Sequence, residues 1–411
     1  MTITSIFPAI GLGILLFWGA SVIVDRSAFY QTAIQSASKA QYKTLDGLRG
    51  FLALGVFFHH AVISYQYFQI GIWKTTPSSV YAFLGQGAVA FFFMITGFLF
   101  WSKMIVKPSF NLKQFYLKRA LRVLPAYWFS LALIVLIVLI VSQFSLKVSL
   151  PRFLIQLSSW IVCGIYGFSN VNTEQLFPDL NYSSVGLINA SVQWTLTYEL
   201  QFYLLLPLLV WLVKPWRFLA LFLGLLTCSL LIPYVPLLTV RGFLFGMAAA
   251  YLVKKFEPKN WLSKRWVSLG ILLLLAAIPL LITPPYIESM KAIVLIFIAF
   301  VCIASGNDLF GLLTASASKY LGTISYSVYL LHGIVLFCVL RLVNLIYPIQ
   351  GMNPLNFWIL AGVCGLLTIG LSGITYRYIE YPFLRLKPST GVVEKPELAQ
   401  TSPIPVNTKG R

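Results

Sequence analysis

Three histidines, all within apolar stretches, are the side chains of this sequence best suited to moving a proton or a chemical group. They are His59, His60 and His332. An imidazole can act near neutral pH as a general acid, a general base or a nucleophile. Titratable side chains are costly in hydrocarbon, so those inside a membrane span are functional candidates by default. The histidines therefore lead the candidates for a reaction site.

Arg49 precedes His60 by eleven residues in the segment LDGLRGFLALGVFFHH. Eleven residues make about three helical turns, so both side chains share a face about 16 Å apart along the axis, whereas His59 points about 100° away. A guanidinium suits a phosphate group of coenzyme A, whose flexible arm would carry a thioester inward to the imidazole. An interfacial arginine and a histidine that bonds a neighbouring helix explain the spacing equally well. Asp46 is expected to cap this helix.

Glu199 stands in QWTLTYELQFYLLLP, about two turns below the expected outer boundary of an otherwise uncharged helix. A carboxylate there would orient an imidazole or take a proton from an incoming hydroxyl. The alternative is a structural ion pair, for which Arg241 is the nearest candidate. At the end of the chain, Glu380 is expected to form an interfacial salt bridge with Arg377.

Ser325, Tyr329 and His332 recur at i, i+4 and i+7 within KYLGTISYSVYLLHGIVLF, so they form one polar stripe on an apolar helix. Such a stripe must face protein or water rather than lipid. Binding of an acceptor from the outer side and structural hydrogen bonding explain it comparably well. Polar residues of the longest outer loop are further candidates for contact with the acceptor, namely Asn172, Glu174, Asp179 and Tyr182.

The composition indicates that membrane-spanning helices position these groups. Apolar residues make up 59% of the 411 residues and charged residues 10%, whereas soluble domains carry about 25% charged residues. A span needs about 20 helical residues. Ten core spans are predicted, namely Asp46–Phe68, Val80–Trp101, Leu124–Gln143, Gln193–Val213, Phe218–Ile232, Leu237–Val253, Trp266–Ile282, Lys291–Ser305, Tyr320–Val343 and Phe357–Tyr376.

The basic residues orient these spans, because cytoplasmic loops are enriched in Lys and Arg. The stretch from Lys103 to Arg122 contains six of them and is expected to be cytoplasmic. Alternation from that anchor places every other strongly basic loop, and the C-terminus, on the same side. The net charge of +19 is thereby explained by topology, and nucleic-acid binding is not expected.

Three apolar or terminal segments fall outside the ten core spans. Residues 153–168 are expected to be interfacial or re-entrant. Residues 3–24 are expected to form an extra helix within an N-terminal segment, 1–44, that precedes a membrane domain at 45–387. The tail, 388–411, is rich in Pro, Ser and Thr and is expected to be disordered. The five cysteines show no close pairing, so neither a disulfide framework nor a metal site is expected.

The order of several short motifs resembles the acyltransferase-3 family of integral-membrane acyltransferases. The Arg49 and His60 pair looks like that family's opening signature. Similar segments follow in family order, namely FFFMITGFLFW (91–101), KRALRVLPAYW (118–128), QWTLTYELQFYLLLP (193–207), RGFLFGMAAAYL (241–252), SYSVYLLH (325–332) and YRYIEYPF (376–383). Each motif is weak alone, and seven in order are strong.

The resemblance implies an all-α polytopic fold of about ten core helices in a bacterial inner or plasma membrane. It implies transfer of an acyl group, usually acetyl, from cytoplasmic acyl-coenzyme A to a carbohydrate, lipid-linked glycan or small hydroxylated acceptor. Catalytic roles are expected for His60, Glu199 and His332. Arg49, Arg119 and Arg122 are expected to bind the donor, and no metal is expected.

Two departures from the family pattern and one alternative function accompany this interpretation. The usual Ser-Gly of the second helix is Thr96-Gly97 here, which adds a methyl group and could alter packing or acceptor choice. The chain also ends soon after the core, without the appended esterase-like domain of some members. Direct transfer and relay through an acyl-imidazole both remain open. The alternative function is a secondary transporter or flippase that uses the buried His and Glu as substrate or proton sites.

Overall fold

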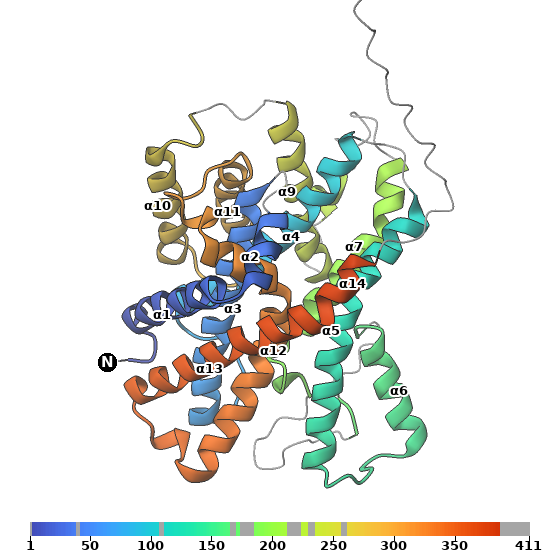
Figure 1. Cartoon of the computed structure of the whole chain (residues 1–411), viewed down its shortest axis with the longest axis vertical. Helices are drawn as coiled ribbons and strands as arrows, with labels where there is room; N and C mark the ends of the chain where they lie inside the picture. Colours follow the sequence, from blue (N-terminus) through green and yellow to red (C-terminus); the bar gives the residue numbers. More distant parts are fainter. Residues whose placement is uncertain are drawn as a thin grey trace, which may run out of the picture.

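The computed structural model describes residues 2–37, 42–106, 111–164, 170–172, 185–211, 223–228, 235–255 and 261–386. Within these ranges the chain is helical and contains no β-strand (Figure 1). Most of the predicted span Phe218–Ile232 and the predicted disordered tail, 388–411, lie outside the described residues. The proposed domain boundaries at residues 44 and 387 stay predictions.

The described helices match the other nine predicted core spans. Among the described residues, six helices are long and apolar enough to cross a membrane, and α10 and α11 are shorter apolar helices. The fold is therefore that of an all-α, multi-pass membrane protein. The helices are α1 (Ile6–Asp25), α2 (Ala28–Ala37), α3 (Lys43–Ile70), α4 (Ser79–Val106), α5 (Leu112–Val141), α6 (Leu150–Ile161), α7 (Gln193–Trp211), α9 (Val235–Lys255), α10 (Arg265–Leu281), α11 (Met290–Ala304), α12 (Ser316–Ile346), α13 (Pro354–Thr375) and α14 (Tyr381–Arg385).

The helix α3 lies at the centre of the bundle and packs on both α4 and α12 (Figure 1). Glycines allow α12 to approach the start of α3 closely. A Cβ atom on Gly322 would lie 1.8 Å from the carbonyl oxygen of Asp46, and one on Gly47 would lie 1.9 Å from that of Leu313. Small residues permit such backbone contact between membrane helices. The close α3–α12 contact fixes the relative positions of the side chains on both helices.

The extra N-terminal helix α1 is present and packs against α12 and α13 (Figure 1). One face is buried, with Leu16 and Ala20 fully inaccessible. The opposite face exposes Phe7, Ile14 and Trp18. A helix that is apolar all round suits a membrane span with one lipid-facing side. The N-terminal segment is thus an integral part of the helical bundle.

The helix α6 covers part of the stretch that was predicted not to span. It has 12 residues, which is too short for a hydrocarbon core that needs about 20. Its face toward the bundle buries Trp160, whereas Leu154 and Ile155 are exposed. The short length agrees with a stretch that does not span the membrane, and its interfacial or re-entrant position stays a prediction.

The boundaries of two helices differ from the sequence-based predictions, and both differences bear on the site. The third core span was predicted to begin at Leu124, but α5 begins at Leu112, where the Asn111 side chain caps it by accepting from the Gln114 backbone N–H at 3.0 Å. The basic residues before Leu124 therefore project from a helix rather than from a loop. Asp46 does not cap α3, which begins three residues earlier, at Lys43.

Candidate active site

A pair of imidazoles joins α3 to α12 at the centre of the bundle. The Nδ1 atom of His60 lies 2.9 Å from the Nε2 atom of His332. The two rings are nearly parallel, with centroids 5.1 Å apart and an interplanar angle of 27°. His332 is fully buried, and His60 is partly buried. Two of the three predicted catalytic residues therefore form one unit.

The hydrogen bonds of this pair determine which ring nitrogen carries the proton. The Nδ1 atom of His332 lies 3.0 Å from the carbonyl oxygen of Val328, which can only accept, so this nitrogen is the donor. In the neutral ring, Nε2 of His332 then accepts, and Nδ1 of His60 must donate to it. A neutral His60 consequently keeps a lone pair on Nε2. That nitrogen can take a proton or attack a carbonyl carbon.

The neighbouring histidine has a different environment. The Nδ1 atom of His59 lies 2.8 Å from the carbonyl oxygen of Tyr81. Its ring packs on Gly85, where any Cβ atom would come within 2.4 Å of the imidazole. His59 is therefore a structural histidine between α3 and α4. The ring of His60 also stacks on that of Trp73, with centroids 6.2 Å apart.

A cavity of about 980 Å³ lies between α3, α4, α5, α7 and α12. One end, here called the basic end, contains five cationic side chains, those of Arg49, Lys103, Lys118, Arg119 and Arg122. The wall at the other end, here called the inner end, is formed by Val89, Phe92, Phe93, Thr195 and Tyr329. A cavity of this kind suits a ligand with an anionic head and a less polar arm. The three predicted donor-binding arginines all line it.

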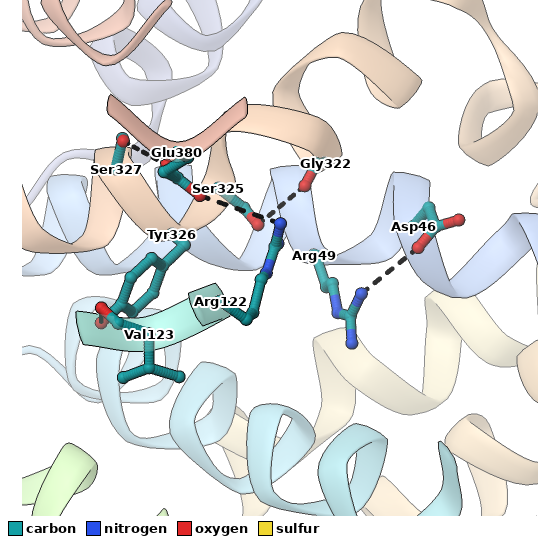
Figure 2. A network of polar contacts seen from close by, with 9 residues as sticks. All are labelled: Asp46, Arg49, Arg122, Val123, Gly322, Ser325, Tyr326, Ser327 and Glu380. Carbon is teal, nitrogen blue, oxygen red and sulfur yellow. Dashed lines mark hydrogen bonds and ion pairs between the residues drawn. The ribbon is translucent and has the colours of Figure 1, made fainter. Parts of the chain in front are cut away.

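Within the basic end, each arginine is oriented by a different neighbour. The Nη1 atom of Arg49 lies 3.3 Å from Oδ1 of Asp46, one turn earlier on α3 (Figure 2). The guanidinium of Arg119 lies over the ring of Phe100, 4.7 Å from its centroid. Both arginines are thus held at the cavity wall by contacts that leave part of the guanidinium available to an anion.

Arg122 is held by a buried carboxylate (Figure 2). Its Nη1 atom lies 3.8 Å from Oε2 of Glu380, whose side chain is only 1% exposed. The hydroxyl of Ser327 donates to Oε1 of the same carboxylate. A π-helical turn, Tyr376–Glu380, joins α13 to α14 and carries this glutamate at its end.

The predicted pairing of Glu380 with Arg377 was wrong. The guanidinium of Arg377 instead lies over the rings of Phe29 and Tyr378. Glu380 turns inward because the buried Ser327 hydroxyl and the Arg122 guanidinium lie on that side. A buried carboxylate requires such partners. Glu380 is a residue of the site that sequence reasoning missed.

Glu199 lies on the wall of the same cavity as the basic residues, rather than in a separate outer chamber. It accepts a hydrogen bond from the hydroxyl of Tyr203, one turn later on α7. Arg241, the proposed structural partner, lies elsewhere and donates from Nη1 to the carbonyl oxygen of Glu288 at 2.7 Å. Glu199 therefore faces the space in which a ligand of the arginines would bind.

The inner end of the cavity approaches the imidazole pair without including it. Tyr329 lies three residues before His332 on α12, and the ring centroids of the two are 6.1 Å apart. The hydroxyl of Tyr329 shares a hydrogen bond of 2.7 Å with that of Thr195. Ser325, the remaining member of the polar stripe, also lines the cavity. The stripe therefore runs from the cavity to the histidines.

Sequence reasoning missed part of the basic end because it placed residues 112–123 in a loop. In a helix, Arg122 lies four residues after Lys118 and three residues after Arg119, so its side chain neighbours both of theirs. The outer-loop residue Asn172, predicted to contact an acceptor, is instead buried and bonds Ser142, Ser145, Lys147 and Gln156. The other three predicted acceptor contacts, Glu174, Asp179 and Tyr182, lie outside the described residues.

Comparisons with known proteins agree on one class of protein. Residues 42–377 match the Acyltransferase domain of the acyltransferase-3 family. The O-acetyltransferase OatA of Staphylococcus aureus (strain NCTC 8325 / PS 47) is 25% identical over 373 residues, which cover 82% of this chain and 56% of that protein. Nodulation protein 10 of Rhizobium leguminosarum bv. viciae is 28% identical over 184 residues, 44% of this chain and 47% of that protein. The chain thus spans about half the length of these curated relatives.

No solved structure matches this chain significantly. In the part of the chain that the structure describes, His, Cys, Asp and Glu side chains form no group of three or more that could hold a metal ion.

Proposed function

The chain belongs to the acyltransferase-3 family, and from this premise we propose that it transfers an acyl group, acetyl by default, from cytoplasmic acyl-coenzyme A to a hydroxyl of a carbohydrate or related acceptor. The observation that carries the proposal is the order of three features. Five cationic side chains line the basic end of a cavity of about 980 Å³, and a hydrogen-bonded pair of imidazoles lies beyond its inner end. Each part matches one requirement of the reaction.

The basic end suits the phosphate groups of the donor. Arg49, Arg119 and Arg122 present planar guanidinium groups, which bind phosphate oxygens in pairs. Lys103 and Lys118 add point charges to the same wall. The pantetheine arm of the donor would extend toward the inner end, which brings the thioester to Tyr329 and the histidines beyond it. The predicted topology places the basic end on the cytoplasmic side.

His60 performs the proton or acyl transfer in this proposal, and His332 orients it. In direct transfer, Nε2 of His60 takes the proton of the acceptor hydroxyl while the hydroxyl oxygen attacks the thioester carbon. The C–S bond then breaks, and the coenzyme A thiolate leaves and is protonated. In a relay, Nε2 attacks the thioester carbon first, the C–S bond breaks and the coenzyme A thiolate leaves, so that an acyl-imidazole forms. The acceptor oxygen then attacks the acyl carbon, the bond from that carbon to Nε2 breaks, and the proton of the acceptor hydroxyl passes to the thiolate. Both routes need the same lone pair on Nε2.

His332 has a positioning role because its own Nδ1 proton is committed to the Val328 carbonyl. It therefore presents an acceptor to His60 and fixes the ring of His60 in one tautomer. The orienting group of a catalytic triad acts on its histidine in the same way. Glu199 acts on the donor side, where its carboxylate lies beside the arginines and is available as a proton acceptor.

The match of residues 42–377 to an Acyltransferase domain disfavours the alternative of a secondary transporter. The OatA relatives are named O-acetyltransferases, which supports oxygen as the acceptor atom. Acyl-coenzyme A as donor and the carbohydrate as acceptor are inferred from the basic cavity and the family together.

The test uses purified protein in detergent or liposomes with radiolabelled acetyl-coenzyme A. Wild type is compared with His60→Ala, Arg49→Ala and Arg377→Ala. We expect His60→Ala to bind the donor but to lose turnover, and Arg49→Ala to weaken donor binding at least tenfold. Arg377→Ala serves as the matched control, because its guanidinium lies over Phe29 and Tyr378 rather than in the cavity wall. Wild type that neither binds nor consumes acetyl-coenzyme A would contradict the proposal.

A further inference from the structure

Three of the five side chains that form the inner end of the cavity, those of Phe92, Tyr329 and Thr195, contact one another. The ring of Phe92 on α4 packs edge-to-face on that of Tyr329, with centroids 6.0 Å apart. The hydroxyl of Tyr329 is fixed by the Thr195 hydroxyl at 2.7 Å and donates to the carbonyl oxygen of Val192 at 3.3 Å. Tyr329 is therefore held from both sides.

In the binding mode proposed above, the acyl group of the donor lies beside this wall. Lys103 and Val89 line opposite ends of the cavity on α4, fourteen residues and about 21 Å apart. The ring of Tyr329 is 6.1 Å from that of His332, which in turn bonds His60. A thioester that approaches His60 from the basic end therefore places its acyl carbons against Phe92 and Tyr329.

Phe92 is the residue of this wall that can be substituted without loss of a hydrogen bond. It is only partly buried, whereas its neighbours Phe91 and Phe93 are 3% exposed and belong to the core. Thr96 lies one turn along α4 on the same face and also lines the cavity. Thr96, which stands where the family usually has serine, thus lines the donor cavity.

We propose that Phe92, held against Tyr329, is the residue that limits the acyl group to a short one. The inference rests on the proposed function and adds acyl-chain selectivity to it. An aromatic wall beside the reacting carbon admits an acetyl group, and each further methylene meets the ring. A pocket wall discriminates by about 10- to 200-fold per methylene group. Replacement of the ring by a methyl group removes that obstacle.

The experiment measures equilibrium binding of acetyl-, butyryl- and hexanoyl-coenzyme A to purified full-length protein, which requires no acceptor. Wild type is compared with Phe92→Ala and with Phe100→Ala. Phe100 lies eight residues along the same helix, about 12 Å away, and lines the same cavity beneath Arg119. We expect wild type to bind hexanoyl-coenzyme A at least tenfold more weakly than the acetyl ester. Phe92→Ala should reduce this ratio to below threefold.

The control should change all three affinities by one common factor, because Phe100 contacts the guanidinium that would bind the donor head. A wild type that binds all three esters equally, or a Phe92→Ala variant that keeps the wild-type ratio, would overturn the inference. Failure of every ester to bind wild type would instead contradict the proposed function. If thermal unfolding shows that Phe92→Ala is unfolded, Phe92→Leu replaces it, with a smaller change in ratio expected in the same direction.

Discussion

The Nδ1 atom of His60 and the Nε2 atom of His332 lie 2.9 Å apart, although 272 residues separate them in the chain. This contact converts two isolated buried histidines into an ordered pair with a defined proton arrangement. In the neutral pair, Nε2 of His60 keeps its lone pair.

Replacement of His332 by Ala should lower turnover by about 100-fold or more, because His60 loses the group that fixes its tautomer and orientation. The dissociation constant of the donor should change less than twofold, since His332 does not line the cavity. Labelled acetyl-coenzyme A allows both quantities to be measured on one preparation. Equal losses in binding and turnover would show that His332 supports the fold rather than His60.

Arg122 and Glu380 should show strong coupling in thermal unfolding. Arg122→Ala removes the cationic partner of a buried carboxylate and should destabilise the protein by about 3 kcal/mol. Glu380→Gln keeps an oxygen that accepts from Ser327, so the double variant should recover more than half of that loss. Unfolding in detergent of the wild type, both single variants and the double variant tests this. Strict additivity of the two single effects would argue against the pairing.

Glu199→Gln should separate donor binding from turnover. Removal of a negative charge from the wall of a cavity that holds five cations should tighten coenzyme A binding a few-fold. Turnover should fall by about 100-fold, because an amide cannot serve as a proton acceptor. Tyr203→Phe is the companion variant, since it removes the hydrogen bond to Glu199 and keeps the carboxylate. Unchanged turnover in Glu199→Gln would exclude a catalytic role.

Gly322→Ala should destabilise the bundle by about 1 to 3 kcal/mol or more, because the added Cβ atom would lie 1.8 Å from the Asp46 carbonyl oxygen. The contact between α3 and α12 would have to open, which would also separate the histidine pair. Gly370→Ala on α13 is the matched control, since its Cβ atom would meet nothing within 4 Å. Thermal unfolding of both variants should show a loss for Gly322→Ala alone.

Much of the fold could be predicted from local patterns. Apolar runs of about 20 residues are specified by the chain itself, because hydrocarbon thickness requires that length. Nine of the ten predicted core spans accordingly match described helices. The start of α5 was misplaced by twelve residues because its first three turns are polar and basic, so hydropathy did not include them.

The candidate site could be predicted in residue type more than in arrangement. Four of the predicted residues do line one cavity, namely Arg49, Arg119, Arg122 and Glu199. They do so because charged side chains on membrane spans must face away from lipid. Glu380 was assigned to the wrong arginine because its neighbour in sequence, Arg377, projects to another side of the chain. Sequence distance carries little information about which buried charges meet.

By itself, the sequence determined that the chain is a multi-pass helical membrane protein and which buried polar residues could do chemistry, since both follow from local composition and helical periodicity. Only the tertiary structure decided which of those residues act together. The contact of α3 with α12 pairs His60 with His332. The ring of Phe92 on α4 meets that of Tyr329 on α12. Such contacts depend on side-chain shapes from distant segments that must fit simultaneously, and no local pattern encodes that fit.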